Sequence, residues 1–172
     1  MKKIIIVLLI TVFVSTITYT QYTVEEFYIH DGENIFYLRI PANEIRRLLG
    51  SPIEEIKIIR EHYHRPNYFI IKYHGIEFTY FDFSHRPEVS PTIIMITFKE
   101  PYKITNINVI GLNKKEVLEH FGEPTRSVEE NDSIFLYYEF NLCMPHHLVL
   151  RFRFNIMGIC DEVSLIHSNF YI

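Results

Sequence analysis

The clearest pattern of apolar and polar positions lies near the end of the chain. From Leu148 to Phe154, every second residue is leucine or phenylalanine, and Val149, Arg151 and Arg153 stand between them. Successive side chains of a β-strand point to opposite faces, so a period of two indicates a strand. We therefore predict a strand at 147–155, with one face against a core and the other carrying arginine.

Similar stretches predict about four strands in each half of the chain. The expected strands are 54–63, 67–73, 76–83 and 92–98 in the first half, and 124–129, 134–142, 147–155 and 162–168 in the second. Turn-forming residues separate them, for example Asn131-Asp132-Ser133. Because consecutive strands joined by short turns pair antiparallel, we expect an antiparallel sheet in each half.

One short helix is expected before each group of strands. Asn113 can cap the start of the second helix, and Glu116 stands three residues later, as in a capping box. Gly50 and Gly122 are expected to end the two helices, because a helix often closes with a residue in the left-handed conformation. A proline two residues beyond each glycine prevents the helix from continuing.

The two halves resemble each other at a spacing of 72 residues. This shift places Leu49-Gly50-Ser51-Pro52 on Phe121-Gly122-Glu123-Pro124, and apolar positions of the two helices match as well. Because a repeat fixes the architecture, we predict an α+β fold of two tandem repeats, at 21–100 and 101–172. Each repeat is a short helix, or a helical hairpin, on about four antiparallel strands, and the two sheets could join into one curved sheet.

Residues 1–20 have the pattern of a secretory signal peptide. Lys2 and Lys3 form a basic start, Ile4–Val14 is apolar, and a small polar segment follows before Gln21. The apolar segment is shorter than the roughly 20 residues that span a bilayer. We expect an exported protein, periplasmic or secreted, with no stable membrane anchor after cleavage. An uncleaved signal anchor is the alternative.

The second faces of the predicted sheets are rich in aromatic residues and arginine. Tyrosine and arginine are enriched where proteins bind each other, because they combine buried area with directional hydrogen bonds. The predicted partner-binding residues are Phe69, Tyr73, Phe81, Phe135, Tyr137, Arg151 and Arg153. The alternative is that these aromatic side chains fill a junction between the two repeats.

Composition and charge narrow the classes of function. The 172 residues are 48% hydrophobic and carry a net charge of −4, whereas a general nucleic-acid binder carries a basic excess. Six glycines and two cysteines argue against a collagen-like chain and a disulfide-dense miniprotein. We therefore expect a chain with its own hydrophobic core and no nucleic-acid partner.

The segment Gly111–Pro124, followed by Leu136-Tyr137-Tyr138, resembles a known repeat. Its spacing is similar to the β-lactamase-inhibitor-protein-like (BLIP-like) repeat, which is shared with outer-membrane assembly lipoproteins of the SmpA/OmlA type. The first half matches only at four positions within 44–52. The resemblance implies a helix-on-sheet repeat whose tandem members grip another protein on a concave sheet. This chain departs from the group because it has no lipid-accepting cysteine, no tryptophan on the sheet and no pair of disulfides.

Candidate chemistry is sparse along the chain. His62 and His64 are two residues apart, so both imidazoles would lie on one strand face and suit Zn²⁺, but spacing fixes no third ligand. We expect no cofactor and no enzymatic activity. Cys143 and Cys160 flank the strand at 147–155, and the length of that strand exceeds the reach of a disulfide. We therefore expect no bridge between them.

The sequence thus predicts an exported, non-enzymatic binding module. It would recognise a protein or another envelope component through the aromatic and arginine face, and the identity of the partner stays open. Two alternatives remain. One is a structural envelope protein without an open binding face, and the other is a metal-dependent enzyme built on His62 and His64.

Overall fold

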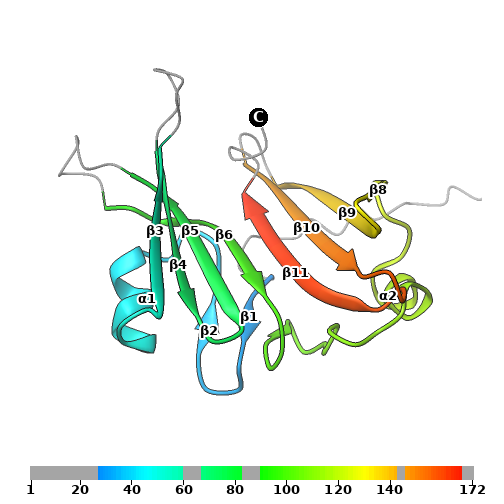
Figure 1. Ribbon diagram of the computed structural model, residues 1–172, viewed down its shortest axis with the longest axis horizontal. Coiled ribbons are helices and arrows are strands. Elements are labelled where there is room, and N and C mark those ends of the chain that lie inside the picture. Colours follow the sequence, from blue (N-terminus) through cyan, green and yellow to red (C-terminus); the bar gives the residue numbers. More distant parts are fainter. Residues whose placement is uncertain (1–26, 60–66, 83–89, 143–145, 168–172) are drawn as a thin grey trace, which may run out of the picture.

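The computed structural model describes residues 27–59, 67–82, 90–142 and 146–167. These residues form two helices and eleven strands (Figure 1). The helices are α1 (Ala42–Leu49) and α2 (Lys114–Phe121). The strands of the first half are β1 (Ile29–His30), β2 (Ile35–Phe36), β3 (Glu54–Ile58), β4 (Tyr68–Tyr73), β5 (Ile76–Phe81) and β6 (Ile93–Phe98). Those of the second half are β7 (Lys103–Ile104), β8 (Arg126–Glu130), β9 (Ser133–Leu142), β10 (His146–Phe154) and β11 (Cys160–His167).

Eight of the strands form one antiparallel sheet. Their order is β3-β4-β5-β6-β11-β10-β9-β8, so two hairpin-connected groups meet where β6 pairs with β11. Strands β2, β1 and β7 form a separate three-stranded sheet. The expected α+β class and antiparallel pairing are confirmed, and a strand overlaps each expected range.

The two helices begin differently but end in the same way. Asn113 and Glu116 form the expected capping box at the start of α2, with bonds of 2.8 and 3.1 Å. Pro41 precedes α1 without a side-chain cap. Gly50 and Gly122 follow the helices with φ of 75° and 76°, values that favour glycine because other residues strain there.

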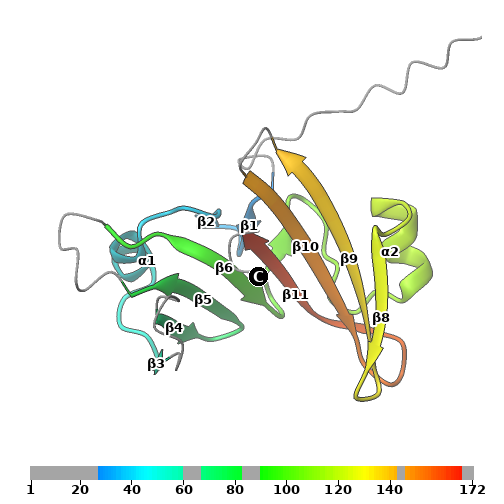
Figure 2. The same ribbon diagram turned by 90° about the horizontal axis from the view of Figure 1, so that it is seen from above.

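A tyrosine of the sheet binds the glycine at the end of each helix. The hydroxyl of Tyr73 donates to the carbonyl of Gly50 at 3.1 Å, and that of Tyr138 donates to the carbonyl of Gly122 at 2.9 Å. α1 and α2 therefore lie on the same face of the sheet, at its two ends (Figures 1 and 2). We call this the helix face, and the opposite side the outer face.

One core fills the helix face from end to end. The strand register places a row of apolar side chains across six neighbouring strands. None of these residues is more than 4% exposed: Ile71, Phe78, Ile96, Leu165, Leu150 and Tyr138. Full burial of one large apolar side chain contributes about 1.5–3 kcal/mol to stability. Since the row crosses both groups of strands, this burial stabilises them as one core.

Candidate functional site

The outer face carries a row of polar residues that crosses all eight strands. Residues paired across antiparallel strands lie on the same face, so the register defines the row directly. Its members, in order from β3 to β8, are Glu54, Lys72, Glu77, Thr97, Ser164, Arg151, Tyr137 and Arg126. We call it the polar row, and its second half contains the predicted residues Tyr137 and Arg151.

A hydrogen-bonded network fixes the middle of the polar row. Arg151 donates from Nη2 to Oγ of Ser164 at 2.8 Å, and the hydroxyls of Ser164 and Thr97 lie 3.0 Å apart. Ser164 is fully buried. A buried hydroxyl without a hydrogen-bond partner costs free energy. The Ser164 hydroxyl therefore favours the position in which Arg151 donates to it.

Guanidinium groups stack on the aromatic residues of the second half. The Cζ atom of Arg126 lies 4.3 Å from the ring centre of Tyr137, and that of Arg151 lies 5.6 Å from the ring centre of Phe135. The two rings are 6.5 Å apart. These separations suit cation–π attraction. We define Phe135, Tyr137, Arg126, Arg151 and Arg153 as the aromatic–arginine patch.

Carboxylates next to the patch pair with two of its three arginines. Arg153 bonds Asp161 at 2.8 Å and lies 3.3 Å from Glu162, and these interactions raise the pKa of its guanidinium. Arg151 lies 3.4 Å from the same Glu162 carboxylate. The patch therefore presents ordered hydrogen-bond donors and aromatic rings without a large excess of positive charge.

The middle of the outer face is buried. Val149, Ile166 and Ser164 are 4%, 2% and 0% exposed, and Thr79 is 1% exposed. The Thr79 hydroxyl has no hydrogen-bond partner among the described residues. Phe135, Tyr137, Arg151 and Arg153 are partly exposed and Arg126 is exposed. In the second half, the accessible part of this face therefore lies towards β8.

Two of the predicted site residues were placed on the wrong face. Phe69 pairs with Tyr80 and Tyr73 with Ile76, and all four lie on the helix face. Phe69 stacks on Tyr80 at 5.3 Å, while Tyr73 binds the end of α1. Both side chains complete the core, so they are not part of an outer surface.

Phe81 lies on the outer face but far from the patch. It pairs with Tyr68 on β4, and β6 and β11 separate its strand from β10. At about 4.8 Å per strand, more than 14 Å lies between Phe81 and the nearest patch strand. The structure thus brings together Phe135, Tyr137, Arg151 and Arg153, and leaves Phe81 outside.

Arg126 is a patch residue that the sequence reasoning missed. The hairpin signal at Asn131-Asp132-Ser133 is confirmed, because Asn131 and Asp132 have φ of 48° and 58° and join β8 to β9 directly. A two-residue turn fixes the register, which places Arg126 opposite Tyr137. Counting back from the predicted turn would have found it.

The described residues contain no group of three or more His, Cys, Asp or Glu side chains arranged to hold a metal ion. His62 and His64 lie outside the described residues, as does Cys143. Cys160 is buried as a free thiol, and burial raises its pKa to about 12. A thiol in this state is a poor nucleophile, so Cys160 is a core residue.

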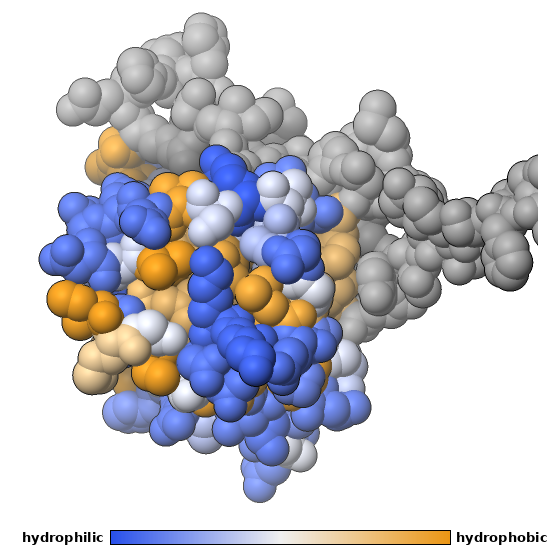
Figure 3. Space-filling view, turned by 90° about the vertical axis from the view of Figure 1, so that its right-hand side faces the viewer, coloured by the Kyte–Doolittle hydropathy of each residue, from blue (hydrophilic) through white to orange (hydrophobic). Residues whose placement is uncertain are grey.

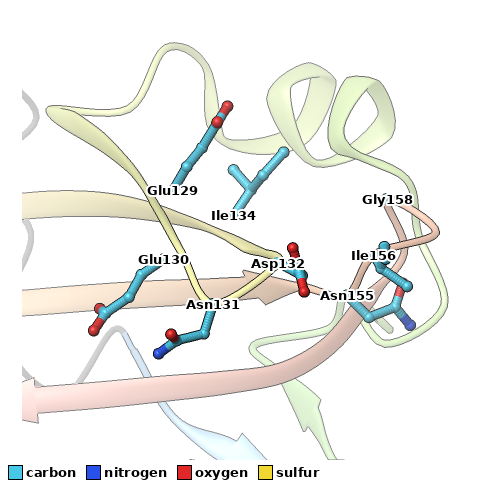
Figure 4. Close-up of a pocket in the computed structure, with 8 residues that line it drawn as sticks. All are labelled: Glu129, Glu130, Asn131, Asp132, Ile134, Asn155, Ile156 and Gly158. Atoms are coloured by element: carbon cyan, nitrogen blue, oxygen red, sulfur yellow. The ribbon is translucent and has the colours of Figure 1, made fainter.

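A hollow of about 390 Å³ lies between the β8–β9 and β10–β11 turns (Figure 4). Its lining is Glu129, Glu130, Asn131, Asp132, Ile134, Asn155, Ile156 and Gly158. Figure 3 views the end of the molecule with α2 and β8, where apolar residues break a largely polar surface. The hollow is acidic and shallow, and it contains no catalytic arrangement of side chains.

Neither α1 nor α2 is long and apolar enough to cross a membrane, and the described residues contain no other α-helix. Comparison with known proteins does not place the chain in a family. No protein-family model, no curated protein and no solved structure matches it.

Proposed function

We propose that the chain is built from two tandem copies of a helix followed by four strands. α1 and α2 each have eight residues, and β3 and β8 each have five. Both pairs start 72 positions apart, from 42 to 114 and from 54 to 126. The paired Tyr–Gly hydrogen bonds support the same equivalence.

The later strands support the repeat once the loops are taken into account. The sheet register breaks between Thr79 and Tyr80 in the first half, and between Arg153 and Phe154 in the second. Each break falls in the third strand of its group, just before a core aromatic residue. The constant spacing of 72 ends at β4 because the connection before β4 is longer than the one before β9.

We infer that this protein is an exported, non-enzymatic binding module that holds a protein partner on the aromatic–arginine patch. The observation that carries this proposal is the stacking of Arg126 and Arg151 on Tyr137 and Phe135. Ordered aromatic and arginine side chains lose little conformational entropy when a partner binds, and they are the residue types enriched in binding hot spots. The resemblance to BLIP-like repeats agrees with a partner held on the sheet.

The ion pairs of Arg151 and Arg153 indicate what kind of partner segment fits the patch. Guanidinium groups that already bond Asp161 and Glu162 offer few strong ion pairs, but the rings of Phe135 and Tyr137 remain partly exposed. A segment with aromatic or aliphatic side chains next to carbonyl or carboxylate oxygens would match this surface. We expect shape and apolar contact to supply more affinity than charge.

Partner capture tests this proposal. The purified protein is immobilised, incubated with an envelope extract and analysed by mass spectrometry. For the protein that the wild type enriches, Tyr137→Ala and Arg126→Ala should each reduce capture roughly tenfold, as expected of hot-spot residues. Tyr37→Ala is the matched control, because Tyr37 is 40% exposed away from the patch. Unchanged capture by a folded Tyr137→Ala variant would refute the patch as the binding site.

The buried middle of the outer face favours a second candidate function, that of a structural envelope protein with a closed face. The two candidates differ in the accessibility of Phe135. In a Cys143→Ser background, a cysteine introduced by Phe135→Cys should react with a maleimide at nearly the rate seen in urea if the patch is open. Ile166→Cys is the slow reference, since Ile166 is 2% exposed. Equally slow labelling at both positions would favour the structural role.

A further inference from the structure

The strand at one edge of the large sheet is flanked by exposed apolar residues. β3 pairs only with β4 among the described residues, so no described strand bonds the backbone N–H and C=O groups on its other side. Four isoleucines lie within or next to it, and two of them are strongly exposed: Ile53 is 61% and Ile59 is 72% exposed. Exposed apolar edges of this kind are sites where another strand can add.

The other edge of the sheet is less apolar. β8 has the sequence Arg-Ser-Val-Glu-Glu, so Val128 is its one apolar residue and two adjacent carboxylates follow it. β3 carries the same number of charges, but it contains two isoleucines and has an exposed isoleucine on either side, so it offers more apolar surface to a second strand. β3 is therefore the edge to which a further strand can be added at the lower cost.

The sequence of β3 is complementary to itself in the antiparallel direction. With Ile56 on a two-fold axis, Glu55 faces Lys57 of the second copy, and Lys57 faces its Glu55. The same register places Ile56 against Ile56 and Ile53 against Ile59. Opposite charges and apolar residues facing each other across antiparallel strands each contribute stability, whereas like charges oppose pairing.

The charged groups remain accessible although each has a partner within the chain. Glu55 is 38% exposed and bonds Arg46 at 3.0 Å, while Lys57 is 44% exposed and lies 2.8 Å from Asp82. A carboxylate accepts several hydrogen bonds and an ammonium donates three, so each group can also bond the second copy. The intrachain contacts hold both side chains next to the edge.

We propose that two copies of this protein associate through antiparallel pairing of β3 with β3, which joins their sheets into one. The interface is isologous, because the same strand serves both copies. It lies at the far end of the sheet from the aromatic–arginine patch, so the dimer presents two patches that remain free for a partner. Because the contact is a single pair of short strands, it belongs to the small, weak class of interfaces.

Sedimentation of charge variants tests both the edge and the register. The wild type should shift from monomer to dimer between roughly 0.01 and 1 mM. Lys57→Glu alone and Glu55→Lys alone each place like charges opposite each other, and should weaken the dimer about tenfold or more. An equimolar mixture of the two variants should restore dimers, because each substituted position then faces the opposite charge. Loss of an intrachain ion pair cannot produce this rescue.

Cysteine crosslinking gives a second measurement that does not depend on charge. In a Cys143→Ser background, Ile56→Cys should form a disulfide-linked dimer, because residues on the axis face their own copies within disulfide reach. Val128→Cys on the other edge is the matched control and should remain unlinked. A urea midpoint close to that of the background protein shows that each variant is folded.

Three results would overturn the proposal. They are a monomeric wild type at 1 mM, a dimer that survives in both single charge variants, and crosslinking at position 128 that equals crosslinking at position 56. A mixture of charge variants that stays monomeric would also reject the register centred on Ile56.

Discussion

At the scale of single residues, tyrosine has two different roles in this sheet. Tyr73 and Tyr138 lie on the helix face and use their hydroxyls to bind the ends of the helices, whereas Tyr137 lies on the outer face under Arg126. Tyr137 and Tyr138 are adjacent in the chain and have opposite roles. The alternation of a strand thus separates a structural residue from a candidate binding residue.

The hydroxyl of Tyr138 gives a testable contribution to stability. Tyr138→Phe removes the bond to the Gly122 carbonyl and should lower the free energy of unfolding by about 0.5–1.5 kcal/mol in urea denaturation. Tyr73→Phe is the comparison. We expect a similar loss, because the Tyr73 hydroxyl donates to the Gly50 carbonyl at the end of α1 in the same way. A loss of stability at one position and none at the other would contradict the proposed equivalence of the two repeats.

The raised pKa of Tyr138 predicts how the stability of the protein changes at alkaline pH. Burial raises the pKa of Tyr138 to about 12, above its ordinary value of 10.0. A group whose pKa is raised by folding contributes stability that is complete below its unfolded pKa and is lost as pH rises through the folded value. The urea midpoint of the wild type should therefore fall between about pH 10 and 12, and Tyr138→Phe should fall less steeply.

At the scale of elements, the strands were predictable because turns and alternation agree. The stretch 148–154 alternates cleanly, and the Asn131-Asp132 turn fixes the register of β9. Which side chains of β4 point to the core was not predictable in this way. Phe69, Ile70 and Ile71 are all apolar, so no alternation with polar residues marks the core side. Its orientation follows from tertiary packing, in which Ile71 meets the buried Phe78.

The two helices differ at the residue that precedes each of them. We therefore expect substitution of that residue to lower the free energy of unfolding by different amounts in the two helices. Asn113→Ala should lower the free energy of unfolding by about 1 kcal/mol, because the amide of Glu116 loses its acceptor. Asn113→Gly should cost only a few tenths of a kcal/mol, since glycine is itself tolerated as a cap. Urea denaturation of both variants checks this, and no loss in either variant would show that the side-chain bond is unimportant.

At the scale of the whole molecule, the β6–β11 pair makes one sheet from two groups of strands. Leu165 and Ile96 face each other in this pair, and both are fully buried. The sequence predicted that the two sheets could join but could not identify the joining strands, because pairing between distant strands depends on packing across the whole core.

This junction predicts that the two halves unfold together. Leu165→Ala should lower the free energy of unfolding by about 2–5 kcal/mol, the range for leucine truncation in a packed core. Far-ultraviolet circular dichroism and tyrosine fluorescence should still report one coincident transition in urea. Two separated transitions would show instead that each half is stable without the other.

The position of β11 also sets the order in which the chain can fold. β11 is the last described strand in sequence, yet it occupies the middle of the sheet, and its partner Met95 precedes Ile166 by 71 positions. The hairpins on either side are local and can form early, but the central pair must close a long loop, and such contacts form slowly. Until β11 emerges from the ribosome, β6 is an apolar open edge. A chain that stalls before residue 160 would therefore expose β6 as an apolar edge strand, a feature that promotes aggregation.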